Sequence, residues 1–257
     1  MKHATNHSQT VGINLSKMNI FSKIKDIIDR RKSLNEIYDD IENMDVVLLE
    51  KKLEIFSEMV TPKFAEIGLK NWNGKYIWYS DFNDEGIKHV VEFNVFKYYG
   101  GSFSFGNCFQ SVPTLSGKKL INHRTDKSTK IIYYKRLEGW QKSFEHNKPF
   151  NPDKISTVNE QKLRKSLDKV LSNNIPKLQK WFNEKTTIEE NISGLLKDVE
   201  NPSFEIGQRI ISTEYILAFL YKQKDDLDSA EYWIQEHFKK SLNDKTEMEL
   251  IIKRIKK

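Results

Sequence analysis

The spacing of apolar residues divides the chain into three zones, and the first, about 18–68, is predicted to be helical. Apolar side chains recur every three or four residues over 46–67, which places them on one face of a helix. Shorter amphipathic helices are expected over 20–28 and 34–41. Together these segments predict a set of N-terminal helices with a buried face.

The ends of helix 46–67 carry recognisable boundary residues. Asp45 is placed to cap the N-terminus, and Gly68 is placed to end the helix. Pro62 should either kink the helix or restart it behind Thr61 as a new cap. We therefore expect an interrupted helix that stops before residue 69.

Apolar and polar residues alternate in the second zone, about 69–150. A period of two is typical of strands with one buried face, and glycine-containing turns separate the first three runs. The strands are expected over 76–80, 91–96, 102–105 and, after a polar loop over 116–129, 130–135. With helix 46–67 packed on one face, this zone predicts an α+β domain built on an antiparallel β-meander.

The third zone, about 157–257, returns to helical spacing. Thr157 and Glu160 have the spacing of a capping box, ahead of a helical pattern that Pro176 interrupts. The polar turn 224–226 joins two amphipathic arms into a helical hairpin, and one more helix follows. The groove of this hairpin is one of two candidate binding surfaces.

These zones predict three parts of the chain. Residues 1–17 are polar without a helix signal and are interpreted as a flexible tail. Residues 18–156 form the α+β domain, with N-terminal helices packed on the antiparallel sheet. The α-helical C-terminal region, 157–257, forms a second domain or a subdomain.

Composition excludes several classes of protein. Cys108 is the only cysteine, which excludes an intramolecular disulfide and a cysteine-rich zinc site. No apolar run approaches the roughly 20 residues that span a membrane, and the N-terminus lacks a signal peptide's apolar core. We therefore expect a cytoplasmic protein that does not bind membranes. No cofactor and no metal site is predicted, because the histidines show no metal-ligand spacing.

Cys108 is the strongest candidate for a nucleophile, because His123 could act as its base. The preferred interpretation is a small core residue, since Cys108 continues a strand with aromatic inward positions. Gly117 and Lys118 resemble part of a phosphate-binding loop, but the earlier glycine and the following Ser or Thr are missing. The sequence therefore leans against catalysis without excluding it, and no catalytic residue is assigned.

The positive charge is concentrated in one segment. The chain has 42 Lys and Arg against 36 Asp and Glu, a net charge of +6. Residues 118–136 hold seven basic residues and one acidic residue, Asp126, which is again +6. Cations beside aromatic residues suit an acidic protein or a nucleic acid. The candidate basic and aromatic surface consists of Lys118, Lys119, Arg124, Lys127, Lys130, Tyr133, Lys135, Arg136 and Trp140.

A helix that contains Pro62 and ends at Gly68, strands over 74–79 and 90–95, and a Phe-rich strand with Gly106 resemble a known bacterial pattern. Over about 45–145 the chain resembles a bacterial family of domains of unknown function, in which a helix precedes a β-meander. The resemblance implies that fold and no mechanism. It also implies a recurring arginine and tryptophan, for which Arg136 and Trp140 are candidates, and by analogy a role like that of immunity proteins to bacterial toxins.

The favoured function is a non-catalytic, protein-binding module of a bacterial cell, of immunity or regulatory type. Its candidate surfaces are the basic segment and the groove of the C-terminal hairpin. The first alternative is an enzyme that acts on a small or phosphorylated substrate. The second is a weak nucleic-acid binder, which the modest charge and the lack of an RNA-binding aromatic motif disfavour.

Overall fold

A computed structural model of the chain describes residues 27–28, 31, 45–96, 100–137, 153–201 and 211–256. The chain forms two compact units, 1–44 and 45–257. In the first unit, Ile27, Ile28 and Arg31 are helical, and the predicted tail 1–17 lies outside the described residues. The second unit holds the sheet and the helices α2 to α10.

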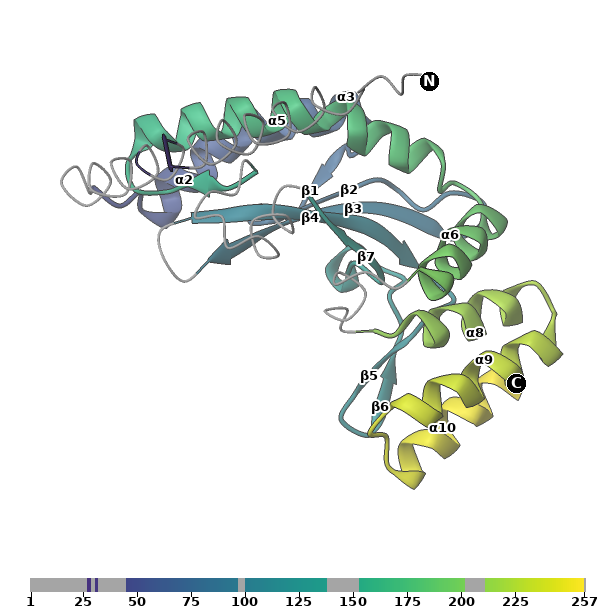
Figure 1. Ribbon diagram of the computed structural model, residues 1–257. Helices are drawn as coiled ribbons and strands as arrows, with labels where there is room; N and C mark the ends of the chain where they lie inside the picture. Colours follow the sequence, from purple (N-terminus) through teal and green to yellow (C-terminus); the bar gives the residue numbers. More distant parts are fainter. Residues whose placement is uncertain are drawn as a thin grey trace, which may run out of the picture. The chain divides into compact units, whose positions relative to one another are not determined.

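The second unit is built on an antiparallel sheet with helices before and after it in sequence, which confirms the predicted α+β class. Neighbouring strands follow the order β1-β2-β3-β4-β7, and β8 pairs with the start of β4 (Figure 1). A separate hairpin, β5–β6, overlaps the start of the predicted polar loop 116–129 and was not expected. The strands are β1 (Asn71–Trp72), β2 (Ile77–Tyr79), β3 (Ile87–Phe96), β4 (Gly100–Phe109), β5 (Thr114–Ser116), β6 (Lys119–Ile121), β7 (Tyr133–Arg136) and β8 (Ile155–Ser156).

The predicted helix 46–67 consists of α2 (Leu49–Ile55), a π-helical turn η1 (Phe56–Val60) and α3 (Thr61–Glu66). The π-helical turn directly precedes Pro62, whose missing N–H and bulky ring disturb the regular helical ladder. Gly68 follows the helix at φ 90°, as expected for a helix-ending glycine. This part of the chain is therefore a bent helix with one buried face.

The predicted Asp45 cap is wrong, and of the two alternatives expected at Pro62, a new cap at Thr61 does not occur. Leu48 holds the N-cap position of α2, and Asp45 instead donates its backbone N–H to Val158 O at 3.0 Å. Thr61 does not cap α3, because its hydroxyl accepts a hydrogen bond from Trp78 Nε1 at 2.9 Å. In both cases contacts with a distant segment replace the local capping interaction.

Helix α5 (Glu160–Asn183) runs without a break through Pro176, which was expected to interrupt it. Its N-cap is Asn159, whose side chain accepts from Lys162 N, so the predicted Thr157 cap is wrong. Helix α6 (Ile188–Glu200) follows and was not anticipated; its capping box is formed by Thr187 and Glu190.

The predicted C-terminal hairpin and last helix are confirmed as α8 (Thr213–Gln223), α9 (Leu227–Lys240) and α10 (Lys245–Lys256). Asp225 at φ 60° forms the turn between α8 and α9, and Asp226 caps α9 through Ser229 N. These helices share one apolar core with the end of the sheet, so the predicted boundary after residue 156 falls inside a compact unit. No described helix is long and apolar enough to cross a membrane.

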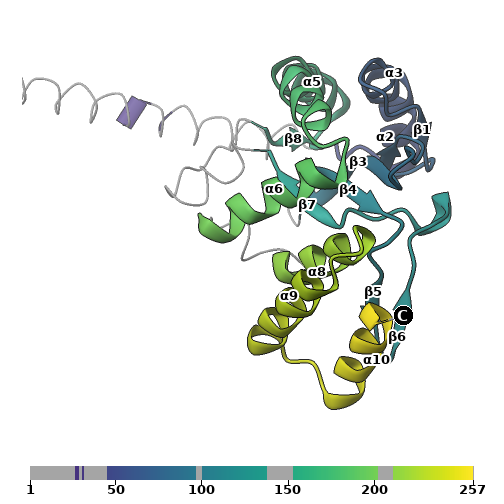
Figure 2. The same ribbon diagram turned by 90° about the vertical axis from the view of Figure 1, so that its right-hand side faces the viewer.

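The two faces of the sheet differ in what covers them. On the first face, Trp78, Val91, Phe93 and Phe103 pack against α2–α3 and α5, which lie above the sheet in Figure 2. On the second face, Cys108 lies in a smaller apolar cluster with Tyr79, Val90 and Ile131. Farther along this face the strands carry polar side chains instead.

Candidate functional site

The basic segment 118–136 does not form one continuous surface. It leaves the sheet as the β5–β6 hairpin, returns through a 3-10 turn, η2 (Asp126–Ser128), and ends in β7. Its eight candidate residues are therefore distributed over the hairpin, the turn, β7 and the stretches that connect them. The ninth candidate, Trp140, lies outside the described residues. Each location gives its cations a different role.

The hairpin carries the most exposed cations of the segment. Lys118 and Lys119 are exposed at its tip, where Gly117 adopts φ 56°. This is a hairpin turn, which agrees with the rejection of the phosphate-loop interpretation. Arg124 is exposed beyond β6, and residues 110–125 contain no carboxylate. The hairpin therefore presents uncompensated positive charge to solvent.

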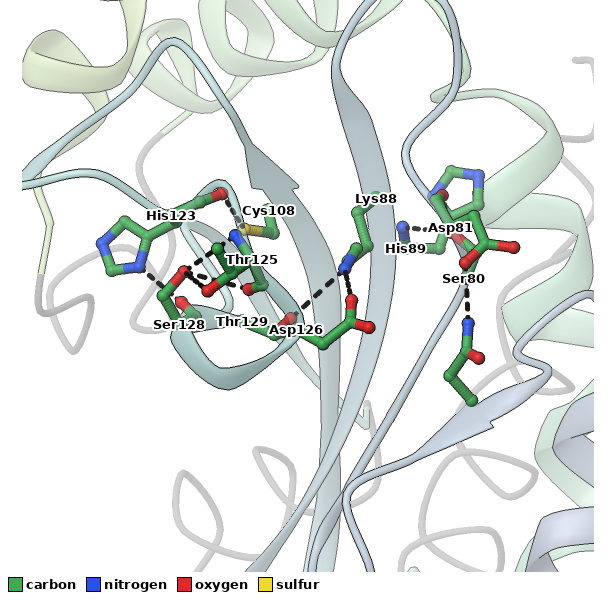
Figure 3. Close-up of polar contacts among 11 residues, drawn as sticks. Ser80, Asp81, Lys88, His89, Cys108, His123, Thr125, Asp126, Ser128 and Thr129 are labelled. Atoms are coloured by element: carbon green, nitrogen blue, oxygen red, sulfur yellow. Dashed lines mark hydrogen bonds and ion pairs between the residues drawn. The ribbon is translucent and has the colours of Figure 1, made fainter.

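Lys127 is exposed on η2, whose neighbouring Asp126 is held by a buried lysine. Lys88 is only 1% exposed, and its amine lies 2.7 Å from Asp126 Oδ1 and 3.4 Å from Thr129 Oγ1 (Figure 3). The amine also lies 4.6 Å and 4.4 Å from the ring centroids of Tyr79 and Phe82, which are cation–π distances. The only carboxylate of the basic segment therefore faces the sheet, where it compensates Lys88.

Replacing Asp126 by asparagine should lower the free energy of unfolding by about 1–2 kcal/mol, because it leaves the buried Lys88 charge without its counterion. This cost is below that of a fully buried pair, because the Asp126 side chain is 63% exposed. Lys88→Met should change the free energy of unfolding by less than about 1 kcal/mol, because the methionine side chain can make the same contacts with the aromatic rings. Urea unfolding of both single variants and the double variant measures the coupling, and an Asp126→Asn cost unchanged in the Lys88→Met background would contradict this account.

Lys130 and Arg136 lie on the second face of the sheet, beside polar side chains of β3 and β4. The Arg136 Nε donates to Tyr134 Oη at 2.8 Å, and Tyr134 Oη lies 2.7 Å from Ser104 Oγ. Asn94 Nδ2 donates to the same serine oxygen. Register explains the grouping, because Ser104 pairs with Arg136 and, on its other side, with Glu92.

Two cavities adjoin this polar cluster. The first, of about 380 Å³, is lined by Asn94, Ser104 and Arg136 among others. The second, of about 230 Å³, shares Asn94 and Arg136 with it and is also lined by Glu92 and Lys130. Burial raises the pKa of Glu92 above its ordinary value, and the charge of Lys130 partly offsets this shift. The cluster therefore places hydrogen-bonding groups beside space large enough for a small molecule. The period-two pattern of β3 and β4 would have identified these residues as one face.

Tyr133 and Lys135 point to the other face of β7 and contact α6. Tyr133 is 2% exposed and donates its hydroxyl to Asp198 Oδ2 at 2.9 Å, while the Lys135 amine lies 3.1 Å from Asp198 Oδ1. Tyr133 is therefore not part of a surface, contrary to the prediction. Its aromatic ring belongs to the core between the sheet and the C-terminal helices.

The side chains of Cys108 and His123 do not form a nucleophile and base pair. The Cys108 thiol is buried and contacts the backbone carbonyl of His123, at 3.9 Å (Figure 3). The imidazole nitrogens instead face Thr114 Oγ1 at 2.8 Å and Ser128 O at 2.6 Å. Burial raises the pKa of Cys108 to about 11, which disfavours the thiolate. The predicted role as a core residue is confirmed.

A groove of about 450 Å³ lies beside the predicted hairpin, between its second arm α9 and the following helix α10. It is not the groove between the two arms, α8 and α9, that the sequence predicted as a binding surface. Ile234, Ile252 and Ile255 line the α9–α10 groove, together with ion-paired residues at its rim. The rim pairs are Lys256 with Glu231, and Lys239 with Glu236. The charges at the rim of this groove are therefore balanced, unlike those on the β5–β6 hairpin.

The described residues contain no group of three or more His, Cys, Asp or Glu side chains that could hold a metal ion. Comparison of the chain with protein-family models, with curated proteins and with solved structures found no match. The resemblance to a bacterial family of helix and β-meander domains thus stays a prediction. The functional interpretation depends on the residues themselves.

Proposed function

We propose that this protein is a non-catalytic binding protein, and that the β5–β6 hairpin docks on an acidic surface of another protein. The observation that carries the proposal is the charge of residues 110–125, which include Lys118, Lys119 and Arg124 and no carboxylate. Such local charge attracts an acidic partner and speeds association. An immunity-type or regulatory role is the finer form of the same proposal.

The aromatic residues favour a protein partner over nucleic acid. Binding of single strands uses exposed aromatic rings, on which bases stack beside the cations. Within 110–137, where every residue is described, no aromatic side chain is exposed: Tyr133 is buried, and Tyr134 is half-buried and hydrogen-bonded to Ser104. The segment thus offers charge without stacking surfaces.

Among the alternatives, an enzyme would use the polar cluster on the second face of the sheet. Its candidate nucleophile, Ser104, contacts Asn94 and Tyr134 through its hydroxyl. Neither partner is a general base of the kind that activates a serine at neutral pH. This geometry favours binding over catalysis.

Charge reversal at the hairpin tip tests the proposal. Affinity capture from the native cell should recover an acidic protein with the wild type, and Lys118→Glu with Lys119→Glu should reduce its recovery about tenfold or more, because the variant repels it. The matched control is Lys165→Glu with Lys169→Glu, which makes the same charge change at exposed positions of α5. The control variant should recover as much of the acidic partner as the wild type does.

Two outcomes would contradict the proposal. Equal capture of the same proteins by all three forms would remove the hairpin from the interface. Retention of nucleic acid instead of protein, with affinity falling steeply as salt increases, would favour the nucleic-acid alternative.

A further inference from the structure

A basic pocket of about 310 Å³ lies where the chain after β6 meets α8 and α10. Figure 2 shows the β5–β6 hairpin beside α10, and Arg254 Nη2 joins the two by donating to Asn122 Oδ1 at 3.2 Å. Three separate segments each contribute one cation to the pocket. Its lining residues are Ser111, Arg124, Phe219, Lys222, Gln223 and Arg254.

No carboxylate lines the pocket beside Arg124 and Arg254. The Arg254 guanidinium contacts a neutral amide, and the Lys222 amine donates to the backbone carbonyl of Arg254. Among the described residues, neither Arg124 nor Arg254 forms an ion pair. Arg124 and Arg254 place two like charges at one cavity, and a bound anion would relieve their repulsion.

Ser111 supplies a hydrogen-bonding group without a partner. Its Oγ is buried and makes no hydrogen bond with any described residue. Buried hydroxyls are almost always hydrogen-bonded in folded proteins, so an unpartnered one at a basic pocket indicates a missing acceptor. An oxyanion bound beside Arg124 and Arg254 would accept this hydrogen bond.

We propose that this pocket binds a phosphate group. Arginine presents several N–H donors in a planar fork that matches phosphate oxygens, and two arginines at one cavity suit a phosphate dianion better than a carboxylate. Phe219 gives the pocket an apolar wall against which the organic part of a phosphate ester can pack. The inference goes beyond the proposed function, since a small phosphate compound satisfies the pocket without a protein partner.

Isothermal titration calorimetry of the full chain with inorganic phosphate tests the proposal. Arg254→Gln should weaken binding about tenfold or more, because it removes a charge-assisted hydrogen bond. The matched control is Lys253→Gln, an equal charge change at the exposed neighbouring position of α10, which should change affinity less than about twofold. Ser111→Ala should weaken binding about threefold to tenfold without unfolding the protein, because it removes an unpartnered buried group.

Titrations with phenyl phosphate and acetate complete the test. Tighter binding of phenyl phosphate identifies an ester as the ligand class and tighter binding of inorganic phosphate a free ion, and each supports the site. No saturable binding of either compound, equal binding of acetate, or equal effects of Arg254→Gln and Lys253→Gln would overturn it. Lys118→Glu with Lys119→Glu should leave phosphate binding intact, so failure of this site is distinguishable from failure of the protein-binding proposal.

Discussion

Gly106→Ala is expected to lower the free energy of unfolding by more than about 3 kcal/mol. A Cβ atom at this position of β4 would lie 1.8 Å from Tyr133 O and 2.7 Å from Ile131 Cγ2. The first contact is with backbone, which cannot move aside without opening the β4–β7 ladder, where Gly106 pairs with Tyr134. The polar cluster of Ser104, Tyr134 and Arg136 spans the same ladder and should be lost with it.

Gly117→Ala is the matched control for this prediction. Gly117 has φ 56°, but an added Cβ would meet nothing within 4 Å, so its replacement costs only backbone strain of about 1 kcal/mol. Urea unfolding of both variants compares the two costs. A Gly106→Ala variant as stable as the Gly117→Ala variant would mean that β4 and β7 do not approach as closely as described.

Trp78→Ala is expected to destabilise the fold by about 3–5 kcal/mol. Trp78 is fully buried, and its ring lies 5.7 Å from Phe56, 5.4 Å from Phe64 and 5.9 Å from Phe103, in edge-to-face arrangements. Its indole N–H also donates to Thr61 Oγ1. This side chain joins the bent N-terminal helix to β2 and β4, so its removal opens a cavity between helix and sheet.

Trp72→Ala is the control for Trp78. Trp72 stacks on Trp78 at 5.9 Å but is only half-buried, and its indole N–H has no hydrogen-bond partner among the described residues. Its loss should cost about half as much, because less apolar area leaves water and no hydrogen bond is broken. Thermal or urea unfolding that ranked Trp72→Ala as the more damaging change would contradict the assigned core.

Much of the fold could be predicted because its elements obey a single local period. The 46–67 pattern predicted a helix with a buried face, and alternation predicted β2, β3 and β4. A fourth strand was expected over 130–135, and β7 overlaps it. Two amphipathic arms joined by the polar turn from Lys224 to Asp226 likewise predicted the α8–α9 hairpin. In these segments, local sequence and tertiary burial favour the same structure.

Other features depend on contacts between distant residues. Asp45 and Thr61 have the composition of caps, but contacts with Val158 and Trp78 give their polar groups other roles. Strands β5 and β6 contain only three residues each, too few to show a period. Short elements and caps are decided by tertiary structure, which a local pattern does not contain.

The candidate site was predicted only in part, since charge can be counted along a sequence but its compensation cannot. Asp126 and Lys88 are 38 residues apart and pair in the fold. Arg124 and Arg254 line one pocket although they are far apart in the chain. Tyr133 lies among cations in sequence but is buried in the structure. The hairpin, with Lys118 and Lys119, keeps the exposed positive charge expected for the whole segment.

The dissociation constant of the captured acidic partner tests the central claim most directly. It should be measured for the hairpin variant, Lys118→Glu with Lys119→Glu, and for the control variant, Lys165→Glu with Lys169→Glu. The account predicts that the hairpin variant binds about tenfold or more weakly than the control at low salt, and that the gap narrows as salt screens the charges. Equal dissociation constants for the two variants would show that the hairpin is not the binding surface.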